Sequence, residues 1–253
     1  MRFMKINEPV SIIIPVYNCL KYLRECIESV FKYTDNYELI IIDNASYGPT
    51  RDYIKSLNNV RVITNKENRG FAYACNQGVK IAKYKYYCLL NSDTVVTPDW
   101  LSKLMKGFNQ PNAGIVTPTT TYCPATQSLF KKPKDDISID EIIKLSFTLE
   151  EGYQEIIDLQ GFCYLIKKEV IDKIGVFDWK NFPIGGAEEV DFNRRARKAG
   201  FRLYWVKQSF VHHYRHKTFE EMKIDKHIIT KSNLEVLRKK KSPNLFIENE
   251  VEI

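Results

Sequence analysis

The sequence of 253 residues has no apolar run that approaches the ~20 residues needed to cross a bilayer. Its first eight residues are too few and too polar for a signal peptide, so we expect a cytoplasmic protein. None of its six cysteines forms a C-x-x-C pair, which argues against a zinc ribbon. The sequence also lacks G-x-G-x-x-G after its first predicted strand and has no G-x-x-x-x-G-K-S/T. These absences disfavour a dinucleotide-binding domain and a P-loop enzyme.

Positive charge is in excess, with a formal net charge of +7 at pH 7. The densest basic run is Arg238-Lys239-Lys240-Lys241, near the end of a predicted helix. Cations are favoured there by the helix dipole, so we interpret the run as a solvated helix end. The alternative is a peripheral contact with the inner face of the membrane. We expect no nucleic acid partner.

Apolar strands alternate with helical patterns through the first half of the chain, which predicts an α/β fold with a mainly parallel sheet. We expect strands at 11–14, 38–42, 60–63 and 86–90, and helices at 20–30, 50–57 and 71–82. Thr97 and Pro98 suit the N-cap and first position of the next helix. Residues 117–155 indicate a variable loop or lid around one short helical stretch. Strands at 159–166, 202–206 and 209–211 follow, with helices at 190–199 and 224–240.

Polar residues follow the first two strands directly. Pro15, Tyr17 and Asn18 come after the first strand, and Asp43 and Asn44 after the second. In an open α/β sheet, ligands bind at the carboxyl ends of the strands. The Tyr17 ring offers a surface on which a base can stack, and the Asp43 carboxylate can accept from a pyrimidine N–H. These segments therefore predict a nucleotide site, the alternative being ordinary turn and cap residues.

A glycine opens the helix predicted at 71–82, because Gly70 permits a tight entry from the loop that contains Asn68. The free N–H groups at Phe71 and after it can face a phosphate or a sugar oxygen. Asn76 lies among small residues on the same helix, which suggests that its side chain has a defined binding partner. The alternative is a buried amide whose hydrogen bonds are made by the backbone.

The fourth strand ends in Asn91-Ser92-Asp93. A hard carboxylate oxygen such as that of Asp93 can bind the divalent ion that best neutralises a diphosphate. A late histidine cluster could add an imidazole ligand. His213 is our first candidate and His212 the second, and strand alternation allows only one of them to face the site. Arg215 and His216 could instead contact the diphosphate.

Three acids crowd the predicted start of one helix, at Glu188, Glu189 and Asp191. Like charges this close repel one another, although the helix N-terminus stabilises their ionised forms. One such carboxylate could remove the proton from an attacking hydroxyl group. The alternative is a charged, solvated first helical turn.

Taken together, these segments resemble family 2 glycosyltransferases of the GT-A fold, over roughly residues 10–219. The run from Asn68 to Gly78 matches N-x-G-F-A-x-A-x-N-x-G, and Asn91-Ser92-Asp93 occupies the place of D-x-D with Asn for the first Asp. The run from Gly185 to Asp191 is similar to G-G-E-D-x-D/E, with Ala187 as an apparent insertion. The resemblance is strongest to bacterial rhamnosyltransferase-like enzymes of surface polysaccharide synthesis.

The resemblance implies one GT-A domain, a Rossmann-like mixed sheet flanked by helices. Residues 8–116 would bind the nucleotide sugar, 117–220 would carry the acceptor and catalytic half, and 221–253 would form a C-terminal helix and tail. It also implies a UDP- or dTDP-sugar donor, a glycan or lipid-linked glycan acceptor, Mn²⁺ or Mg²⁺, inversion and no covalent intermediate.

The same resemblance implies roles for individual residues. Glu189 would be the base and Glu188 would position the acceptor, or the reverse, with Gly186 and Asp191 binding the acceptor. Metal ligands would be Asp93 and one histidine. The donor would be bound by Pro15, Tyr17, Asn18, Asp43, Asn44, Asn68, Gly70, Phe71, Asn76, Asn91, Ser92 and Asp93. A sugar-phosphate nucleotidyltransferase and a non-catalytic nucleotide-sugar-binding protein remain as alternatives.

Overall fold

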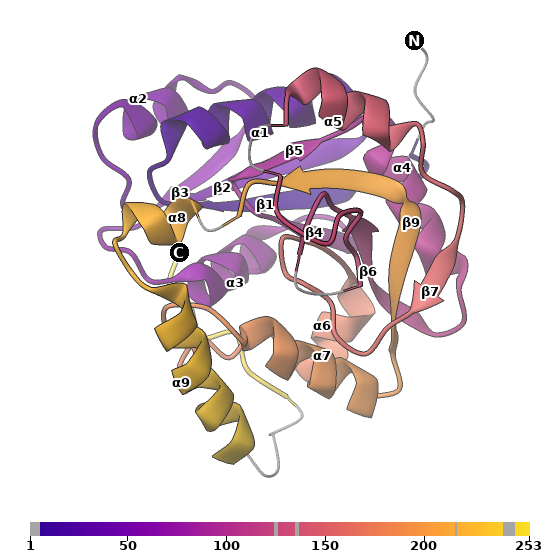
Figure 1. Cartoon of the computed structure of the whole chain (residues 1–253). Helices are drawn as coiled ribbons and strands as arrows, with labels where there is room; N and C mark the ends of the chain where they lie inside the picture. The colour runs from indigo at the N-terminus through magenta and orange to yellow at the C-terminus, as the bar shows by residue number, and fades with distance from the viewer. Residues whose placement is uncertain (1–5, 124–125, 135–136, 216, 240–245) are drawn as a thin grey trace.

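The computed structural model describes residues 6–123, 126–134, 137–215, 217–239 and 246–253. Its centre is a nine-stranded sheet with the order β3-β2-β1-β4-β8-β6-β9-β5, and β7 pairs with β9. Helices cover both faces of this sheet (Figure 1). The fold is the mixed α/β arrangement that the sequence predicts.

The first half of the chain forms the parallel part of the sheet. It runs β1 (Val10–Val16), α1 (Leu20–Tyr33), β2 (Tyr37–Asp43), α2 (Gly48–Ser56), β3 (Arg61–Thr64), α3 (Phe71–Ile81) and β4 (Tyr86–Leu90). Strand β1 pairs in parallel with both β2 and β4, and β2 pairs in parallel with β3. The polar residues that follow β1, β2 and β4 therefore meet at one edge of the sheet.

The second half adds mostly antiparallel strands. It runs β5 (Thr94–Val96), α4 (Trp100–Met105), the short helix η1 (Lys106–Asn109), β6 (Ala113–Thr119), α5 (Ile139–Ser146), β7 (Tyr153–Glu155) and β8 (Cys163–Lys167). Then follow α6 (Lys168–Ile174), α7 (Glu188–Lys198), β9 (Arg202–His213), α8 (Lys217–Glu221) and α9 (Lys226–Lys239). Strand β8 is antiparallel to β4 and β6, and β9 is parallel to β6 but antiparallel to β5.

Three local predictions were wrong. Helix α4 begins at Trp100 after Asp99, whose φ is 61°, and the Thr97 hydroxyl donates to the Phe210 carbonyl instead of capping the helix. The two late strands are one strand, β9, with a register shift against β6. The segment at 117–155, predicted as a loop or lid around one short helical stretch, contains that helix as α5 but also β7 and the end of β6.

The core lies on both faces of the sheet because alternate residues of each buried strand point to opposite sides. Ile12 and Ile14 of β1 pack with Leu23 of α1 on one face. On the other face, Ile13 packs with residues of α3, α6 and α7, including Cys75 of α3 and Phe192 of α7. No helix in the described part of the chain is long and apolar enough to cross a membrane.

Candidate active site

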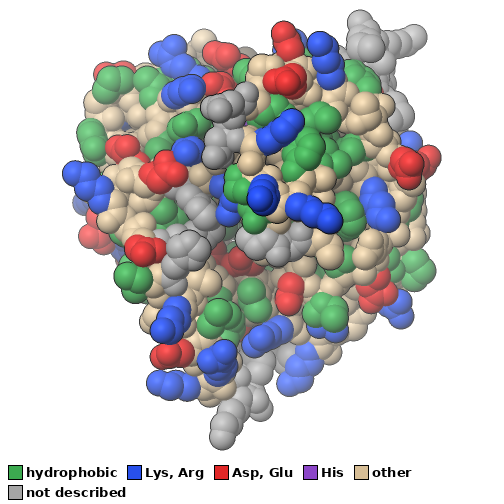
Figure 2. Space-filling view, in the orientation of Figure 1, with side chains coloured by type: hydrophobic (Ala, Val, Ile, Leu, Met, Phe, Trp, Pro, Cys, Tyr) green, Lys and Arg blue, Asp and Glu red, His purple; other side chains and the backbone are tan. Residues whose placement is uncertain are grey.

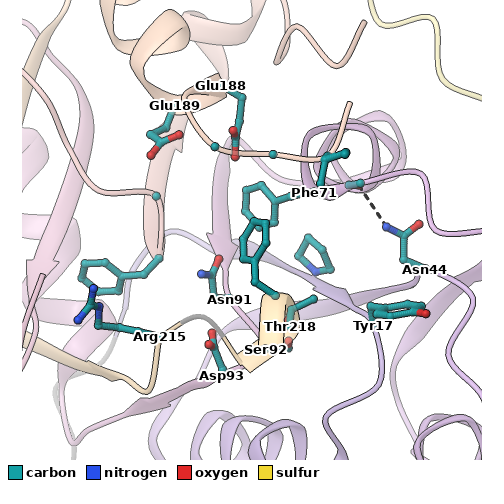
Figure 3. Close-up of a pocket in the computed structure, with 18 of the residues that line it drawn as sticks. Tyr17, Asn44, Phe71, Asn91, Ser92, Asp93, Glu188, Glu189, Arg215 and Thr218 are labelled. Atoms are coloured by element: carbon teal, nitrogen blue, oxygen red, sulfur yellow. Dashed lines mark hydrogen bonds between the residues drawn. The ribbon is translucent and has the colours of Figure 1, made fainter. Parts of the chain in front are cut away.

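A cavity lies at the carboxyl ends of β1, β2 and β4, where the strand ends predicted a site. Figure 3 shows Tyr17 and Asn44 at one end and Asp93 and Arg215 at the other. The wall also includes Pro15, Val16, Asn68, Gly70, Phe71, Asn91, Ser92, Cys123, Gln160, Gly161, Phe162, Ile184, Gly185, Gly186, Glu188, Glu189, His213, Thr218, Phe219 and Met222.

Asn44 ties together the loops around the nucleotide end. Its Nδ2 donates to Asn68 Oδ1 at 2.8 Å and to the Gly70 carbonyl at 3.2 Å. Its Oδ1 accepts from Asn65 Nδ2 at 2.9 Å and from the Arg69 N–H at 3.1 Å. One side chain that follows β2 thus fixes the loop leading into α3, so Asn44 shapes this end of the cavity from a single buried position.

Gly70 is required where α3 begins. Its φ is 79°, and a Cβ at this position would overlap the backbone carbonyl of Pro183. The start of α3 and the loop before α7 therefore touch directly through backbone atoms, a contact only glycine permits.

Asp93 and His213 meet because β5 and β9 are paired, with Thr94 opposite His213. The His213 Nε2 atom lies 3.1 Å from Asp93 Oδ1 and 3.2 Å from Asn91 Nδ2. The His213 ring stacks on Phe162 at 5.4 Å between centroids. His212 points away from this cavity, as alternation along the strand requires.

The carboxyl group of Asp93 is buried but favours its ionised form. Burial raises its pKa, yet the His213 ring, the hydrogen bond from it and the Lys217 backbone N–H together lower the pKa below its usual value. An ionised carboxylate beside an imidazole is a donor set that suits Mn²⁺. In the described residues, no group of three or more His, Cys, Asp or Glu is placed to hold an ion, so these two side chains would be joined by ligand oxygens.

Glu188 and Glu189 begin α7 on the opposite wall, and Figure 3 shows both carboxylates directed into the cavity. Glu188 is 5% exposed, whereas Glu189 is half-buried and accepts from the Ala187 N–H at 3.1 Å. Positive φ angles at Gly185 (107°), Gly186 (87°) and Ala187 (88°) bring the chain round to this wall. The Asn233 amide of α9 donates to the carbonyls of Gly185 and Gly186 and supports the turn.

Several residues predicted for the site lie off the cavity wall. Asp43 Oδ1 accepts from the Ser46 N–H, so its carboxylate orders the turn after β2. Asn76 exchanges two hydrogen bonds with the backbone of Phe177, the structural alternative that the sequence allowed. The remaining three are Asn18, which accepts from the Tyr47 N–H, Asp191 and His212. His216 lies outside the described residues.

Asp191, predicted to bind the acceptor, instead forms a buried ion pair. Its Oδ2 accepts from Arg195 Nε at 2.8 Å, and Arg195 is 0% exposed. The same guanidinium donates to the carbonyls of Ile174 and Val176 at 2.7 and 2.8 Å. This pair anchors α7 to α6 and so holds the acid pair in place from behind.

The sequence prediction missed residues that close the cavity. Thr218, Phe219 and Met222 come from α8 and the turn after it, and Asn68 Nδ2 donates to Met222 Sδ at 3.3 Å. Gln160, Gly161 and Phe162 precede β8. No local pattern marks either segment, because both reach the cavity only through strand pairing with β4, β5 and β9.

Comparison with known proteins agrees with this arrangement. The family model of glycosyl transferase family 2 matches residues 11–175. The glycosyltransferase GlyG of Streptococcus pneumoniae is 31% identical over 115 residues, covering 44% of this chain and 38% of that protein. An uncharacterized glycosyltransferase of Rickettsia prowazekii is 30% identical over 181 residues, covering 67% of this chain and 53% of that protein. The chain thus spans about half or less of the length of these relatives.

Two solved structures share the fold, each with a TM-score of 0.64. One is GalNAc-T7 with UDP, GalNAc and Mn²⁺, at 20% identity over 81% of this chain and 44% of that one. The other is a mannosyltransferase from Pyrobaculum calidifontis with GDP-Man and Mn²⁺, at 16% identity over 93% of this chain and 66% of that one. With a family match that covers well over half of its residues and a GT-A fold, the chain belongs to glycosyl transferase family 2.

Proposed function

We propose that this chain is an inverting glycosyltransferase that moves a sugar from a UDP- or dTDP-sugar to a hydroxyl group of a glycan or lipid-linked glycan in surface polysaccharide synthesis. The observation that carries the proposal is the position of Glu188 and Glu189 across one cavity from Asp93 and His213. A base on one wall and a diphosphate site on the other is what direct displacement at an anomeric carbon needs.

The donor would lie along the strand ends. Tyr17 offers its ring to the base, and the loop that Asn44 holds brings Asn68, Gly70 and Phe71 to the same end. Asp43 stays the predicted acceptor for the edge of the base, from its position behind this wall. The UDP and GDP-Man complexes of the two structural neighbours support a nucleoside diphosphate sugar as the donor class.

A divalent ion fits the other end of the cavity. Asp93 and His213 would hold it, and the Asn91 Oδ1 atom is buried without a hydrogen-bond partner among the described residues, so it offers a further neutral oxygen. Mn²⁺ in both neighbouring structures supports this assignment. When bound, the ion would neutralise charge on the leaving diphosphate. Arg215 lies on the same stretch of wall and adds a fixed positive charge there.

Glu189 would accept the proton of the acceptor hydroxyl. Of the two acids it is the more exposed to the cavity, and the first turn of α7 favours its ionised form. Glu188, more deeply buried, would position the acceptor. The family match ends at residue 175, before α7, so this assignment rests on the geometry of the cavity.

The test is sugar transfer and donor hydrolysis by Glu189→Gln, which keeps the shape and removes the basicity. We expect a loss of about 10²–10⁴-fold in rate with nucleotide affinity nearly unchanged. Glu188→Gln is the paired variant, and Glu150→Gln, an exposed acid near α5, is the control. Near-normal transfer by Glu189→Gln with loss in Glu188→Gln would move the base one residue upstream.

Two further results would contradict the proposal itself. Full activity of both glutamate variants would show that the acid pair has no catalytic role and is only a charged first turn of a helix. Absence of any stabilisation by UDP- or dTDP-sugars would remove the donor class, because a ligand at a hundredfold its dissociation constant adds ~2.7 kcal/mol to stability.

A further inference from the structure

A second cavity lies on the other side of β9 from the acid pair. Its wall is formed by α1, the residues after β6 and the end of β9, and consists of Lys21, Tyr22, Thr121, Tyr122, Pro133, Lys134, His212, His213, Tyr214, Arg215 and Lys217. His213 and Arg215 also line the donor cavity, so the two spaces share part of a wall. Apart from the Lys217 backbone N–H, which donates to Asp93, nothing in the donor chemistry described above uses the other residues.

Positive charge dominates this second cavity. Lys21, Lys134, Arg215 and Lys217 line it, and its described lining includes no carboxylate. Nearby acids offset only part of this charge: Lys217 Nζ lies 3.0 Å from Glu220, and Tyr214 hydrogen-bonds Glu25 behind the wall. The Arg215 guanidinium lies over the Tyr122 ring at 4.6 Å, which leaves its edge available to a ligand. Figure 2 shows Lys and Arg side chains spread over the face seen in Figure 1, with several of them near its middle.

His212 adds a buried polar atom without a partner. Its side chain is on the wall and the residue is 2% exposed. Nδ1 pairs with the Thr121 hydroxyl, while Nε2 has no hydrogen-bond partner in the described part of the chain. An unsatisfied buried polar group costs about 1–3 kcal/mol, so a ligand at this atom would be favoured. If the Thr121 hydroxyl donates to Nδ1, Nε2 carries the hydrogen and is a donor.

We propose that this second cavity binds a phosphate group of the acceptor, beside the donor diphosphate. Several cations, a donor N–H and no facing carboxylate match an oxyanion of more than one charge. The inference rests on the proposed function, which assigns the donor diphosphate to the first cavity and leaves this site for a second ligand. A lipid-linked diphosphate and a phosphate on the glycan share this chemistry.

The first experiment measures binding of inorganic phosphate by calorimetry at low salt, with UDP and Mg²⁺ saturating the donor site. The wild-type protein should bind, and Lys21→Glu and Lys134→Glu should each weaken binding at least fivefold. Lys32→Glu makes the same charge change at an exposed position of α1 outside both cavities, and should change it less than twofold. No phosphate binding by the wild type, or equal weakening by Lys32→Glu, would overturn the site.

A second arm separates the two sources of phosphate. Geranyl diphosphate that binds more tightly than methyl diphosphate, and loses that affinity in Lys21→Glu, supports a lipid-linked acceptor. Equal affinities support a phosphate on the glycan. UDP binding is measured on every variant, and the phosphate affinity must fall at least fivefold more than the UDP affinity. Wild-type protein that binds neither UDP nor dTDP would overturn the proposed function, whereas a bound nucleotide without a second phosphate site would overturn only this inference.

Discussion

The two walls of the donor cavity are built differently. The donor wall consists of residues that directly follow parallel strands, and short-range hydrogen bonds around Asn44 hold it together. The acid wall consists of one helix start, reached through three residues with positive φ and supported by Arg195 and Asn233 from behind. The sheet itself fixes the position of a wall made from strand ends, whereas the position of the acid wall depends on a few long-range contacts.

Substitutions in the two walls should therefore have different effects on stability and on donor binding. Changes behind the acid wall should unfold α7 or misplace both glutamates at once. Changes at the strand ends should weaken donor binding while the sheet persists, because the sheet strands pack on both faces. The following variants test this difference, from the largest expected effect to the smallest.

Arg195→Met should cause the largest loss of stability. It removes the Arg195 half of the buried ion pair with Asp191 and the donors to the carbonyls of Ile174 and Val176. Breaking a buried ion pair costs about 3–5 kcal/mol. Urea unfolding should show this decrease in the free energy of unfolding, whereas Arg197→Met, exposed on the same helix, should change it by less than about 0.5 kcal/mol. Equal stability of the two variants would show that the acid wall does not depend on Arg195.

Gly70→Ala should harm both walls, because the new Cβ would overlap the Pro183 carbonyl in the loop that leads to the glutamates. Overpacking of this kind costs about 1–3 kcal/mol. We expect a loss of at least tenfold in transfer rate, measured as kcat, besides the lower stability. Gly48→Ala is a matched control, since Gly48 also has a positive φ, of 53°, but has no atom within 4 Å of the added Cβ. Similar kinetics in both variants would mean that backbone strain, not the contact, matters.

Asn44→Ala should act mainly on the donor wall. It removes the bonds to Asn68, Asn65 and the backbone of the loop before α3, with a net cost of about 1–2 kcal/mol. Calorimetry should show UDP binding about tenfold weaker with kcat less affected. Asn58→Ala, at an exposed turn after α2, is the control. A fall in kcat with unchanged UDP affinity would instead show that Asn44 supports the acid wall.

The same contrast explains what the sequence could predict. Tyr17, Asn44 and Asp93 were found because each follows its own apolar strand, and parallel pairing brings strand ends together without further information. Alternation along β9 also correctly separated His213 from His212. These inferences use only local sequence and the period of a strand.

The rest depended on contacts between distant segments. Asn76 bonds the backbone of Phe177, which lies 101 positions away, so its structural role could not be read from its own helix. Phe219 and Met222 reach the cavity only because β9 pairs with β5 and directs the chain across it. Asp191 is the exception, because its spacing of four from Arg195 is a local signal for the ion pair that the structure shows.

Glu38→Gln should give the smallest effect and should spare both walls. Glu38 lies in β2 away from the cavity, where its carboxylate accepts from Ser11 Oγ, the Lys83 N–H and Arg61 Nη1. Burial raises its pKa, but these hydrogen bonds and the Arg61 charge together lower it by more than burial raises it, so the folded-state pKa is below the usual value of 4.5. A depressed pKa stabilises the fold above 4.5, and this contribution is lost as the pH falls through the folded-state value.

The glutamine variant should therefore be less stable than the wild type by about 1 kcal/mol at pH 7, and the difference should shrink below pH 4.5. Urea unfolding across this pH range measures it, with Glu28→Gln on the exposed side of α1 as the control. UDP affinity and kcat should stay at the wild-type level, because the strand ends are held by the sheet and not by this cluster. A loss of UDP affinity in Glu38→Gln would show that the donor wall responds to the opposite end of β2. The position of the strand ends would then depend on contacts far along the strand, contrary to what the packing indicates.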